Sequence, residues 1–420
     1  MTKRIALVLL LLILWTGTVV AGALFGWWRR PLAPAGDARA FMKAAAAIAD
    51  ANNGANTAIM LIEGDSINAE YYSTRADTID RHTVFATASL SKWITAHAVM
   101  KLVEQGKLDL DRPVDQYLTR WHLPAGAFST NGVTARRLLS HTAGLTDGLG
   151  FGDYRLDEPL PSLEETLRAP RRSDVRDTSR IVIGIEPGTT FRYSGGGYLV
   201  LELLIEELSG ETFETFVTRE ILQPLGMQRS GYADLAATPN SAKSYRVDGT
   251  PAPIYRYASR AATGFASSTS DLSQLAIAHL KGDKGTVLSA ATLASMRNVE
   301  ARSTGADLWG LGTILYAPTK QGSVVFGHDG ANDPAISSSV RINPESHDAI
   351  IVLATGSSAI ASRLGAEWVL WQTGVPDVLT VPAEIRRVLP VLAVGVGVIL
   401  LLGAVSVWRR RRRSVAARTL

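Results

Sequence analysis

Cysteine is absent from this 420-residue chain, and histidine is scarce, with seven residues. The lack of cysteine excludes a disulfide framework, a thiol nucleophile and an anchor attached through a lipidated cysteine. The histidines lack the spacing of a zinc site. Three consecutive glycines, 195–197, are not followed by the lysine of a phosphate-binding loop. The sequence therefore predicts neither a metal nor a cofactor.

Acidic residues are absent from the two tails of the chain, where basic residues gather. The tails hold ten of them, namely Lys3, Arg4, Arg29, Arg30, Arg409 to Arg413 and Arg418. Subtracting these ten charges from the net charge of +4 leaves −6 for residues 31–408. The net positive charge therefore comes from the basic tails and indicates how the chain is oriented in a membrane, and no nucleic-acid partner is expected.

The first of two long uncharged runs, Ile5–Trp28, follows a Lys-Arg pair. It is long enough to cross a hydrocarbon core of about 30 Å as a helix. Residues 1–30 are therefore expected to be a signal anchor or a signal peptide. Ala21–Ala23 offers a small-x-small cleavage site, whereas Trp27–Arg30 has the composition of an interfacial anchor and favours an uncleaved segment.

The second uncharged run, Val388–Trp408, ends before five consecutive arginines. A basic flank of this kind marks the cytoplasmic side of a membrane helix. We therefore expect a transmembrane helix over residues 386–408 and a basic cytoplasmic tail over 409–420. The domain between the two runs, residues 31–385, is expected to be extracytoplasmic, which places the protein in the cell membrane.

Strand patterns occur near both ends of this domain. Two β-rich runs come early, Thr57–Ile62 and Ile67–Tyr72, and a Glu-Gly-Asp turn joins them. Four more come late: Leu308–Tyr316, Ser323–Gly327, Ile336–Ile342 and Ala349–Ala354. The middle of the chain is helical by pattern, with the clearest helices at Ser91–Gln105, Tyr198–Leu208 and Phe213–Ile221.

This order of elements predicts an α+β fold. An antiparallel sheet flanked by helices is built from both ends of the domain, by residues of about 40–90 and 260–374. A mainly helical part, about 91–259, is inserted between them. Helices at Ala40–Ala51 and Ile360–Gln372 belong to the sheet part.

Ser89 and Lys92 form a Ser-x-x-Lys pair where a loop leads into a predicted helix. Residues three apart on a helix share a face, with Cβ atoms about 5–6 Å apart. A serine hydroxyl is a weak nucleophile at neutral pH and needs a neighbouring base. A lysine buried in a cleft can serve, because loss of solvation disfavours its ammonium form. Alone the pair is a weak signal, since an N-cap serine and a surface lysine have the same spacing.

Further motifs follow this pair and give it weight. They are Leu-Ser-His-Thr-Ala-Gly-Leu at 139–145, Phe-Arg-Tyr-Ser-Gly at 191–195 and Gly-His-Asp-Gly-Ala-Asn at 327–332. In this order they resemble the class C β-lactamase and serine penicillin-recognising family, which includes DD-peptidases, D-aminopeptidases and esterases. The resemblance runs from about Ala40 to Gly374. It implies a β-lactamase/transpeptidase-like fold with the active site between two lobes.

The resemblance also implies a role for each matching residue. Ser89 matches the acylated nucleophile, and Lys92 matches its activating partner. Tyr193 matches the tyrosine that passes protons to and from the leaving group. The backbone N–H groups of Ser89 and Ala331 match the oxyanion hole, whose fixed donors stabilise the developing negative charge.

His328 and Gly195 depart from the family pattern. His328 and Gly330 match the first and last positions of a Lys-Thr-Gly motif on the sheet edge. At the first position histidine replaces lysine and supplies a weaker or pH-dependent charge for a substrate carboxylate. Gly195 stands where asparagine usually helps to hold an acylamide substrate. Both departures argue against efficient β-lactam hydrolysis. His141, before a glycine turn, is expected to be structural.

We therefore expect a serine hydrolase that forms an acyl-enzyme on amide or ester bonds. Candidate substrates are peptides ending in D-amino acids, including cell-wall peptides, and small esters. The alternative is a protein that keeps the fold and binds penicillin or peptidoglycan with little turnover, as Gly195 would suggest. A transporter is disfavoured, because neither apolar run contains an ionisable residue. The substrate, the cleavage of the first segment and the oligomeric state stay open.

Overall fold

The computed structural model describes residues 2–73, 76–147, 153–171, 180–282, 287–303, 305–332 and 334–416. At its centre is an eight-stranded antiparallel sheet of order β2-β1-β12-β11-β10-β9-β8-β7. The strands are β1 (Thr57–Glu63), β2 (Ser66–Ser73), β7 (Ala301–Ser303), β8 (Ala306–Trp309), β9 (Ile314–Pro318), β10 (Val324–Asn332), β11 (Ile336–Asn343) and β12 (Asp348–Thr355). Short two-stranded pairs join β3 (Phe85–Ala86) to β6 (Ala266–Ser267) and β4 (Asp153–Tyr154) to β5 (Arg256–Tyr257).

The two ends of the domain meet in this sheet. Strand β1 pairs antiparallel with β12, from Thr57 opposite Ala354 to Ile62 opposite Ala349. The hairpin β1–β2 from the start of the chain therefore lies beside the last strand. The predicted α+β fold with an antiparallel sheet and flanking helices is confirmed.

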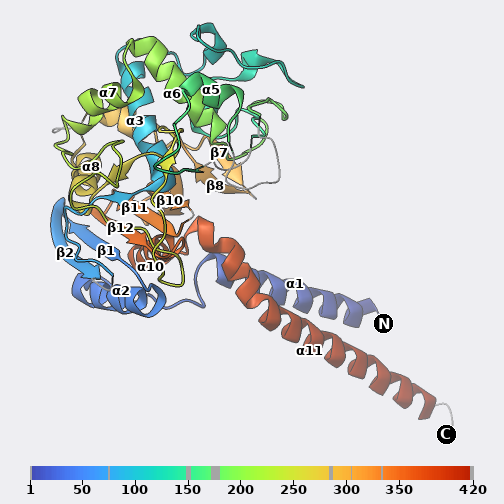
Figure 1. Ribbon diagram of the computed structural model, residues 1–420. Coiled ribbons are helices and arrows are strands. Elements are labelled where there is room, and N and C mark those ends of the chain that lie inside the picture. Colours follow the sequence, from blue (N-terminus) through green and yellow to red (C-terminus); the bar gives the residue numbers. More distant parts are fainter. Residues whose placement is uncertain are drawn as a thin grey trace.

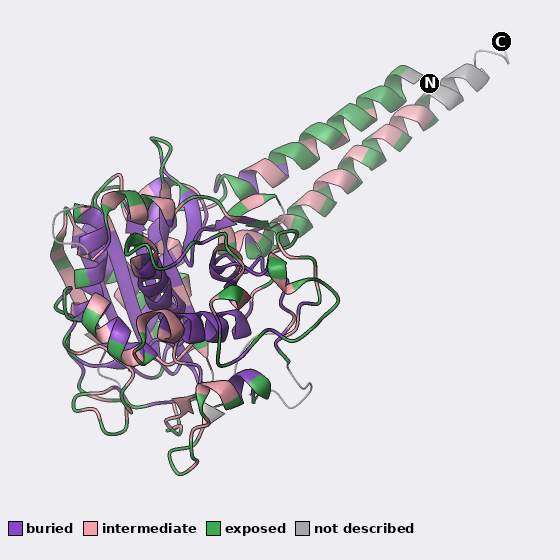
Figure 2. Ribbon diagram, turned by 90° about the horizontal axis from the view of Figure 1, so that it is seen from above, coloured by how far each residue is buried: buried purple, intermediate pink, exposed green. Residues whose placement is uncertain are grey.

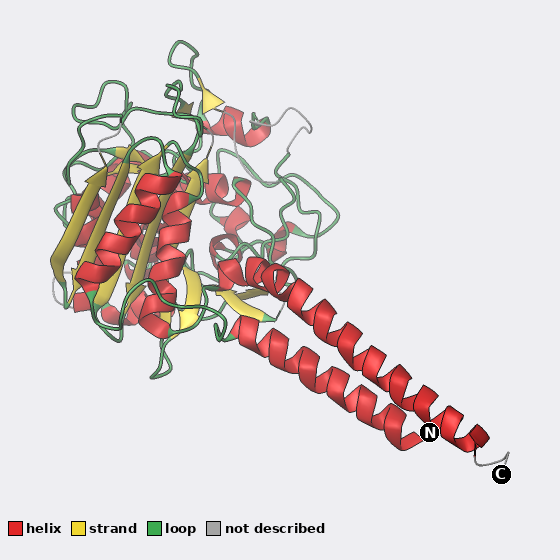
Figure 3. Ribbon diagram, turned by 90° about the horizontal axis from the view of Figure 1, so that it is seen from below, coloured by secondary structure: helices red, strands yellow, loops and turns green. Residues whose placement is uncertain are grey.

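Helices lie on both faces of the sheet: α2 (Ala38–Asn52) and α10 (Ile360–Thr373) on one, and α3 (Ser91–Glu104) and α8 (Thr269–Lys281) on the other. Helices α4 (Ala135–Leu139), α5 (Leu163–Arg168), α6 (Gly196–Ser209) and α7 (Phe213–Val217) pack against α3 and one another, and α9 (Ala290–Ser295) follows α8. Helices α2 and α10 lie across one face (Figure 3), where Phe41 and Trp371 stack with ring centroids 4.9 Å apart.

Side chains alternate between these two layers along each strand. On β1, Ile59 packs into the core under α2 and α10. Met60 packs into a second core, shared with α3, α8 and the helices α4 to α7, which together form the helical lobe. Both cores are almost fully enclosed (Figure 2). Helix α3 runs through the second core, and its first turn therefore lies where the sheet and the helical lobe meet (Figure 1).

Two of the late strands differ from their prediction. Leu308–Tyr316 was expected as one strand, which is wrong: β8 ends at Trp309 and β9 begins at Ile314. Between them Gly312 has φ +65°, and an added Cβ would lie 2.4 Å from Ala96 of α3, so the chain turns to pass the helix. Strand β10 continues to Asn332, beyond the predicted end at Gly327, because β11 pairs with it along that length.

Two further helices, α1 (Thr2–Leu24) and α11 (Val381–Ala416), project from the domain side by side (Figure 1). Trp15 of α1 donates to the carbonyl of Leu392 at 3.2 Å, and Gly395 gives its ring room. Both helices are long and apolar enough to cross a membrane, judged by length and composition. Both helices point away from the domain, and α11 extends farther than α1 (Figure 1).

Ion pairs join the bases of these helices to the domain. Arg29, after α1, pairs with Glu367 of α10 at 2.5 Å and with Glu384 of α11. Arg341 of β11 is 1% exposed and pairs with Asp329 of β10 at 2.7 Å and with Asp377, just before α11. The strand that carries the His-Asp-Gly motif is thereby connected to the start of α11.

Candidate active site

Ser89 lies in a single turn of 3₁₀ helix, η1 (Ala88–Leu90), which leads directly into α3. The residue before it, Ala88, has φ +50°, a left-handed conformation that costs energy for a residue with a Cβ. Ser91 stabilises this turn by donating to the carbonyl of Ala88 at 2.6 Å. The turn leaves Ser89 partly exposed at the N-terminus of a helix, where the helix dipole favours developing negative charge.

The side chain of Lys92 is buried beside this serine. Its Nζ lies 3.3 Å from Ser89 Oγ and donates to the carbonyl of Ala262 at 2.9 Å. It also lies 4.9 Å from the centroid of the Tyr193 ring and 5.5 Å from that of Tyr198. Within the described ranges no carboxylate forms an ion pair with Lys92, so its amine faces the serine and two aromatic rings.

Tyr193 is held in place by stacking. Its ring lies on His141, with centroids 4.2 Å apart and an interplanar angle of 28°, and Trp309 meets it edge-on at 5.7 Å. The backbone N–H of Ser194 donates to His141 Nδ1 at 3.1 Å. His141 therefore supports the segment that carries Tyr193, in keeping with its expected structural role.

A buried carboxylate fixes the next residues of the same segment. Asp147 accepts a hydrogen bond from Ser194 Oγ at 2.5 Å and another from the N–H of Gly196 at 2.8 Å. A Cβ at Gly196 would lie 2.9 Å from the carboxyl carbon of Asp147. Burial raises the pKa of Asp147, and these hydrogen bonds oppose that rise. The N-terminus of α6 is thus anchored next to Gly195.

Strand β10 borders the serine with an unpaired edge. It pairs with β9 from Val324 to Gly327, and from His328 to Asn332 it pairs, among the described strands, with β11 alone. Gly330 is pressed against the serine turn, since a Cβ there would lie 2.1 Å from the carbonyl of Thr87 and 2.9 Å from the N of Ser89. Ala331 follows it and is exposed. A strand edge of this kind can hydrogen-bond to the backbone of an extended ligand.

His328 is 1% exposed and stacks edge-on against Trp309 at 5.4 Å. Its Nδ1 lies 2.6 Å from the carbonyl of Asp329, a contact that requires Nδ1 to donate. Its Nε2 is buried, with no hydrogen-bond partner among the described residues. Burial, together with the charge of Lys92, lowers the pKa of His328 to about 4. At neutral pH this ring is uncharged, and a positive charge at this position appears only in acid.

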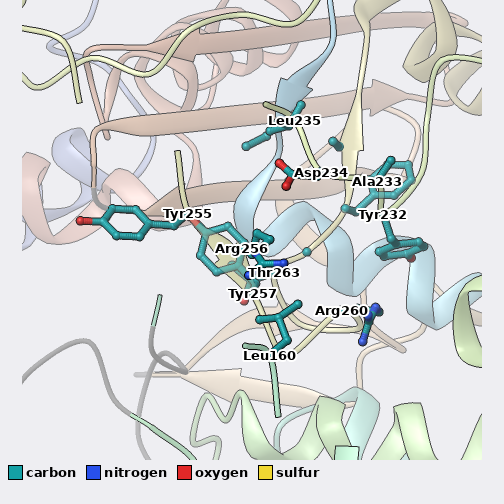
Figure 4. Close-up of a pocket in the computed structure, with 14 residues that line it drawn as sticks. Leu160, Tyr232, Ala233, Asp234, Leu235, Tyr255, Arg256, Tyr257, Arg260 and Thr263 are labelled. Atoms are coloured by element: carbon teal, nitrogen blue, oxygen red, sulfur yellow. The ribbon is translucent and has the colours of Figure 1, made fainter. Parts of the chain in front are cut away.

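A small pocket lies beside β3, the strand that leads into the serine turn (Figure 4). Its volume is about 60 Å³, and its walls include Ala86 of β3 and Phe265, whose carbonyl accepts from Thr87. Tyr232, Tyr257 and Arg260 point into it. The walls therefore combine aromatic surface with a cation.

The structure thus brings Ser89, Lys92, Tyr193, His328 and Gly330 into one region where the sheet and the helical lobe meet. In the part of the chain that the structure describes, no group of three or more histidines and carboxylates is placed to hold a metal ion.

Sequence reasoning missed three residues that contribute to the site. The carbonyl of Ala262, which accepts from Lys92, had no sequence signal. Asp147 follows the Leu-Ser-His-Thr-Ala-Gly-Leu segment by two residues, and Trp309 begins a Trp-Gly-Leu-Gly run. A tryptophan followed by two closely spaced glycines could have marked Trp309 as a residue near the site.

Residues 39–374 match the Beta-lactamase family, which covers most of the chain. Penicillin-binding protein 4 of Amycolatopsis lactamdurans is 30% identical over 332 residues, which cover 73% of this chain and 82% of that protein. The chain belongs to the beta-lactamase family. The predicted family and the predicted enzyme class, a β-lactamase-related serine hydrolase, are confirmed.

Other beta-lactamase family proteins extend the comparison. Esterase EstB of Burkholderia gladioli is 31% identical over 192 residues, covering 41% of this chain and 44% of the esterase. An octameric penicillin-binding protein homologue from Pyrococcus abyssi superposes with a TM-score of 0.66 at 24% identity, covering 80% of this chain and 76% of its own. A D-amino acid amidase from Ochrobactrum anthropi SV3 superposes with a TM-score of 0.59 at 21% identity, covering 83% of this chain and 98% of the amidase. These two structures share the fold of this chain.

Proposed function

We propose that this chain is a membrane-anchored serine hydrolase with Ser89 as nucleophile and Lys92 as its base. Ser89 Oγ attacks the carbonyl carbon of an ester or amide while its proton passes to Lys92 Nζ. The tetrahedral intermediate then expels an alcohol or amine, which takes up a proton through Tyr193. Water attacks the acyl-enzyme, releases the acid and restores the serine hydroxyl.

The observation that carries this proposal is the 3.3 Å separation of Lys92 Nζ and Ser89 Oγ. This separation is close to hydrogen-bond reach, as expected for a base and its nucleophile before substrate binds. Aromatic rings and a carbonyl surround the amine in place of a carboxylate. From this position the amine would take up the proton of the serine hydroxyl.

The oxyanion would bind between the N–H groups of Ser89 and Ala331. The contact of Gly330 with the serine turn supports this assignment, because it brings β10 against the N of Ser89. His328 would border the substrate site as an uncharged ring behind the edge of β10, since its Nε2 is buried and has no partner among the described residues. An uncharged ring offers no ion pair to a substrate carboxylate.

The proposed substrates are small esters and peptides or amides of D-amino acids, cell-wall stem peptides among them. A penicillin-binding protein and an esterase are among the relatives of this chain, which supports both bond types. The free edge of β10 would bind an extended peptide, and the tyrosine-lined pocket beside β3 would take an apolar group.

The proposed placement is a domain of residues 31–385 outside the cytoplasm, held by α1 and α11 in the membrane. The uncharged lengths of both helices and the arginines 409–413 support it. The part formed by about 40–90 and 260–374 and the inserted part of about 91–259 would form the two lobes. The tail, residues 409–420, would lie in the cytoplasm.

A reporter that is active only in the cytoplasm, fused after Leu420, tests the placement of the tail. An inactive, correctly sized fusion argues against a cytoplasmic tail.

A substrate panel tests the chemistry. We expect the full-length protein in detergent to hydrolyse 4-nitrophenyl esters or D-Ala peptides, and a fluorophosphonate probe to label it. Ser89→Ala should abolish both turnover and labelling, whereas Ser66→Ala, at an exposed serine of β2, should keep both. Unchanged labelling of Ser89→Ala would refute the assignment.

A binding protein of the same fold with little turnover is the second candidate. Gly195 favours it, because glycine offers no amide to hold an acylamide substrate. The same panel separates the two candidates: an acyl-enzyme that forms on Ser89 and persists supports the binding protein, and steady ester turnover excludes it.

A further inference from the structure

A large groove lies at the base of the two apolar helices, remote from Ser89. Its volume is about 890 Å³. One wall is formed by the end of α1 and the approach to α11, including Leu24, Phe25, Val378 and Val381. This size lies within the usual range for small-molecule sites, and the wall is apolar where a membrane surface would begin.

The opposite wall comes from the domain and carries one unusual cation. Arg297, after α9, is half-buried, and its guanidinium lies 4.8 Å from the centroid of the Phe326 ring. No described residue forms an ion pair with it or accepts a hydrogen bond from its side chain. Burial lowers its pKa, with no compensating carboxylate. Apart from the Phe326 ring, the guanidinium has no partner among the described residues, so its N–H groups are available to an anion in the groove.

The other charged side chain in the groove does not complete it. Asp307 lies on the same lining but pairs with Arg302 at 2.7 Å, and both are largely exposed. The groove therefore has apolar surface on the side of the helices and, on the side of the domain, a guanidinium with several N–H donors and no ion pair among the described residues. A guanidinium of this kind binds a phosphate through paired hydrogen bonds.

We propose that this groove binds an anionic phospholipid of the adjoining leaflet, with its phosphate on Arg297 and its acyl chains along the bases of α1 and α11. Continuity with the helices gives the lipid direct access, and the unpaired guanidinium selects its headgroup. The proposal rests on the membrane anchoring proposed above and is independent of the chemistry at Ser89. A bound lipid would fix the height of the domain above the membrane.

Native mass spectrometry of the full-length protein in a neutral detergent tests the proposal. The micelles carry phosphatidylglycerol or phosphatidylcholine with identical acyl chains. We expect phosphatidylglycerol to be retained with about tenfold preference, the equivalent of one charge-assisted contact. Arg297→Gln should reduce retention to the phosphatidylcholine level, and Arg297→Lys should keep part of it. Lys320→Gln removes an exposed charge from the nearby β9–β10 turn and should leave retention unchanged.

Several results would overturn the proposal: equal retention of both lipids, no effect of Arg297→Gln, or an equal loss in Lys320→Gln, which would indicate general surface attraction. Inorganic phosphate alone should not displace the lipid, and displacement would assign the site to a free anion. Ester turnover and resistance to carbonate extraction, measured on the same variants, report separately on the proposed chemistry and anchoring. A turnover-competent, membrane-bound protein without lipid preference disproves the groove assignment alone.

Discussion

At the scale of single residues, burial decides which groups near Ser89 carry charge. His328 and His141 are both buried, and burial lowers the pKa of each, with the charge of Lys92 adding to the effect. Neutral imidazoles leave the proposed base with aromatic and carbonyl neighbours. Lys92 is therefore the side chain next to Ser89 Oγ that is proposed as its base.

Replacing Lys92 by arginine separates the role of a base from that of a charge. Arginine keeps the positive charge but does not lose its proton in proteins, so Lys92→Arg should lower kcat/KM for a 4-nitrophenyl ester about 10²- to 10⁴-fold. Lys101→Arg is the matched control, because Lys101 lies on the same helix and also donates to a carbonyl, that of Val287 at 3.0 Å. Near-normal activity of Lys92→Arg would show that only charge is needed.

Glu202 should make stability depend on pH. It is 1% exposed on α6 and accepts from the N–H of Ala261 at 3.0 Å, and burial raises its pKa to about 8. Between about pH 4.5 and 8 the folded chain keeps a proton that the unfolded chain loses, so the free energy of unfolding falls as pH rises. Glu202→Gln should remove this fall, which amounts to a few kcal/mol.

Chemical unfolding in detergent at pH 6 and pH 9 measures this effect. Glu186→Gln, at an exposed position, is the control and should keep the pH dependence of the wild type. An identical loss of stability between the two pH values in Glu202→Gln and the wild type would contradict the assignment.

At the scale of elements, the site depends on how closely β10 approaches the serine turn. Ser338 of β11 donates to the carbonyl of Thr87 at 2.6 Å, next to the contact of Gly330 with the same carbonyl. Two strands are therefore fixed to the loop that precedes α3. Pattern alone predicted this helix, β11 and the first part of β10, but the contact joins residues more than 200 positions apart and leaves no periodic signal.

Gly330→Ala should disrupt this contact. The added methyl group would lie 2.1 Å from the carbonyl of Thr87, so strand and turn must move apart. A displacement of about 1 Å at a reacting group can cost about 10² in rate, and we expect a loss of at least that size in ester turnover. Gly54→Ala, whose Cβ would have its nearest neighbour at 3.9 Å, should be silent. Full activity of Gly330→Ala would show that the turn does not depend on this approach.

At the scale of the whole molecule, buried charges connect the site to the apolar helices. Arg341 contacts Asp329 of the His-Asp-Gly motif and Asp377 before α11. Tyr316 and Ser339 donate to the same Asp329 oxygen at 2.9 and 2.6 Å. The position of the proposed catalytic strand is thus tied to the position of α11.

Asp377→Asn should weaken this connection. Arg341 would keep Asp329 but lose a charge-assisted partner in a buried site, which costs about 1.5–3 kcal/mol. We expect a lower thermal midpoint and faster proteolysis between α10 and α11. Asp307→Asn, in an exposed ion pair with Arg302, should change stability by about 0–1 kcal/mol. Equal effects of the two substitutions would contradict a structural role for the buried pair.

The sequence by itself determined the order of strands and helices, the two apolar helices and the Ser-x-x-Lys pair. These features rest on local periodicity, turn residues and charge, which need only neighbouring positions. Only the tertiary structure decided that β8 and β9 separate at Gly312, that Ala262 and Trp309 border the site, and that Arg297 has no ion-pair partner among the described residues. Such contacts join distant segments, and burial, which no single segment specifies, sets their protonation and their strength.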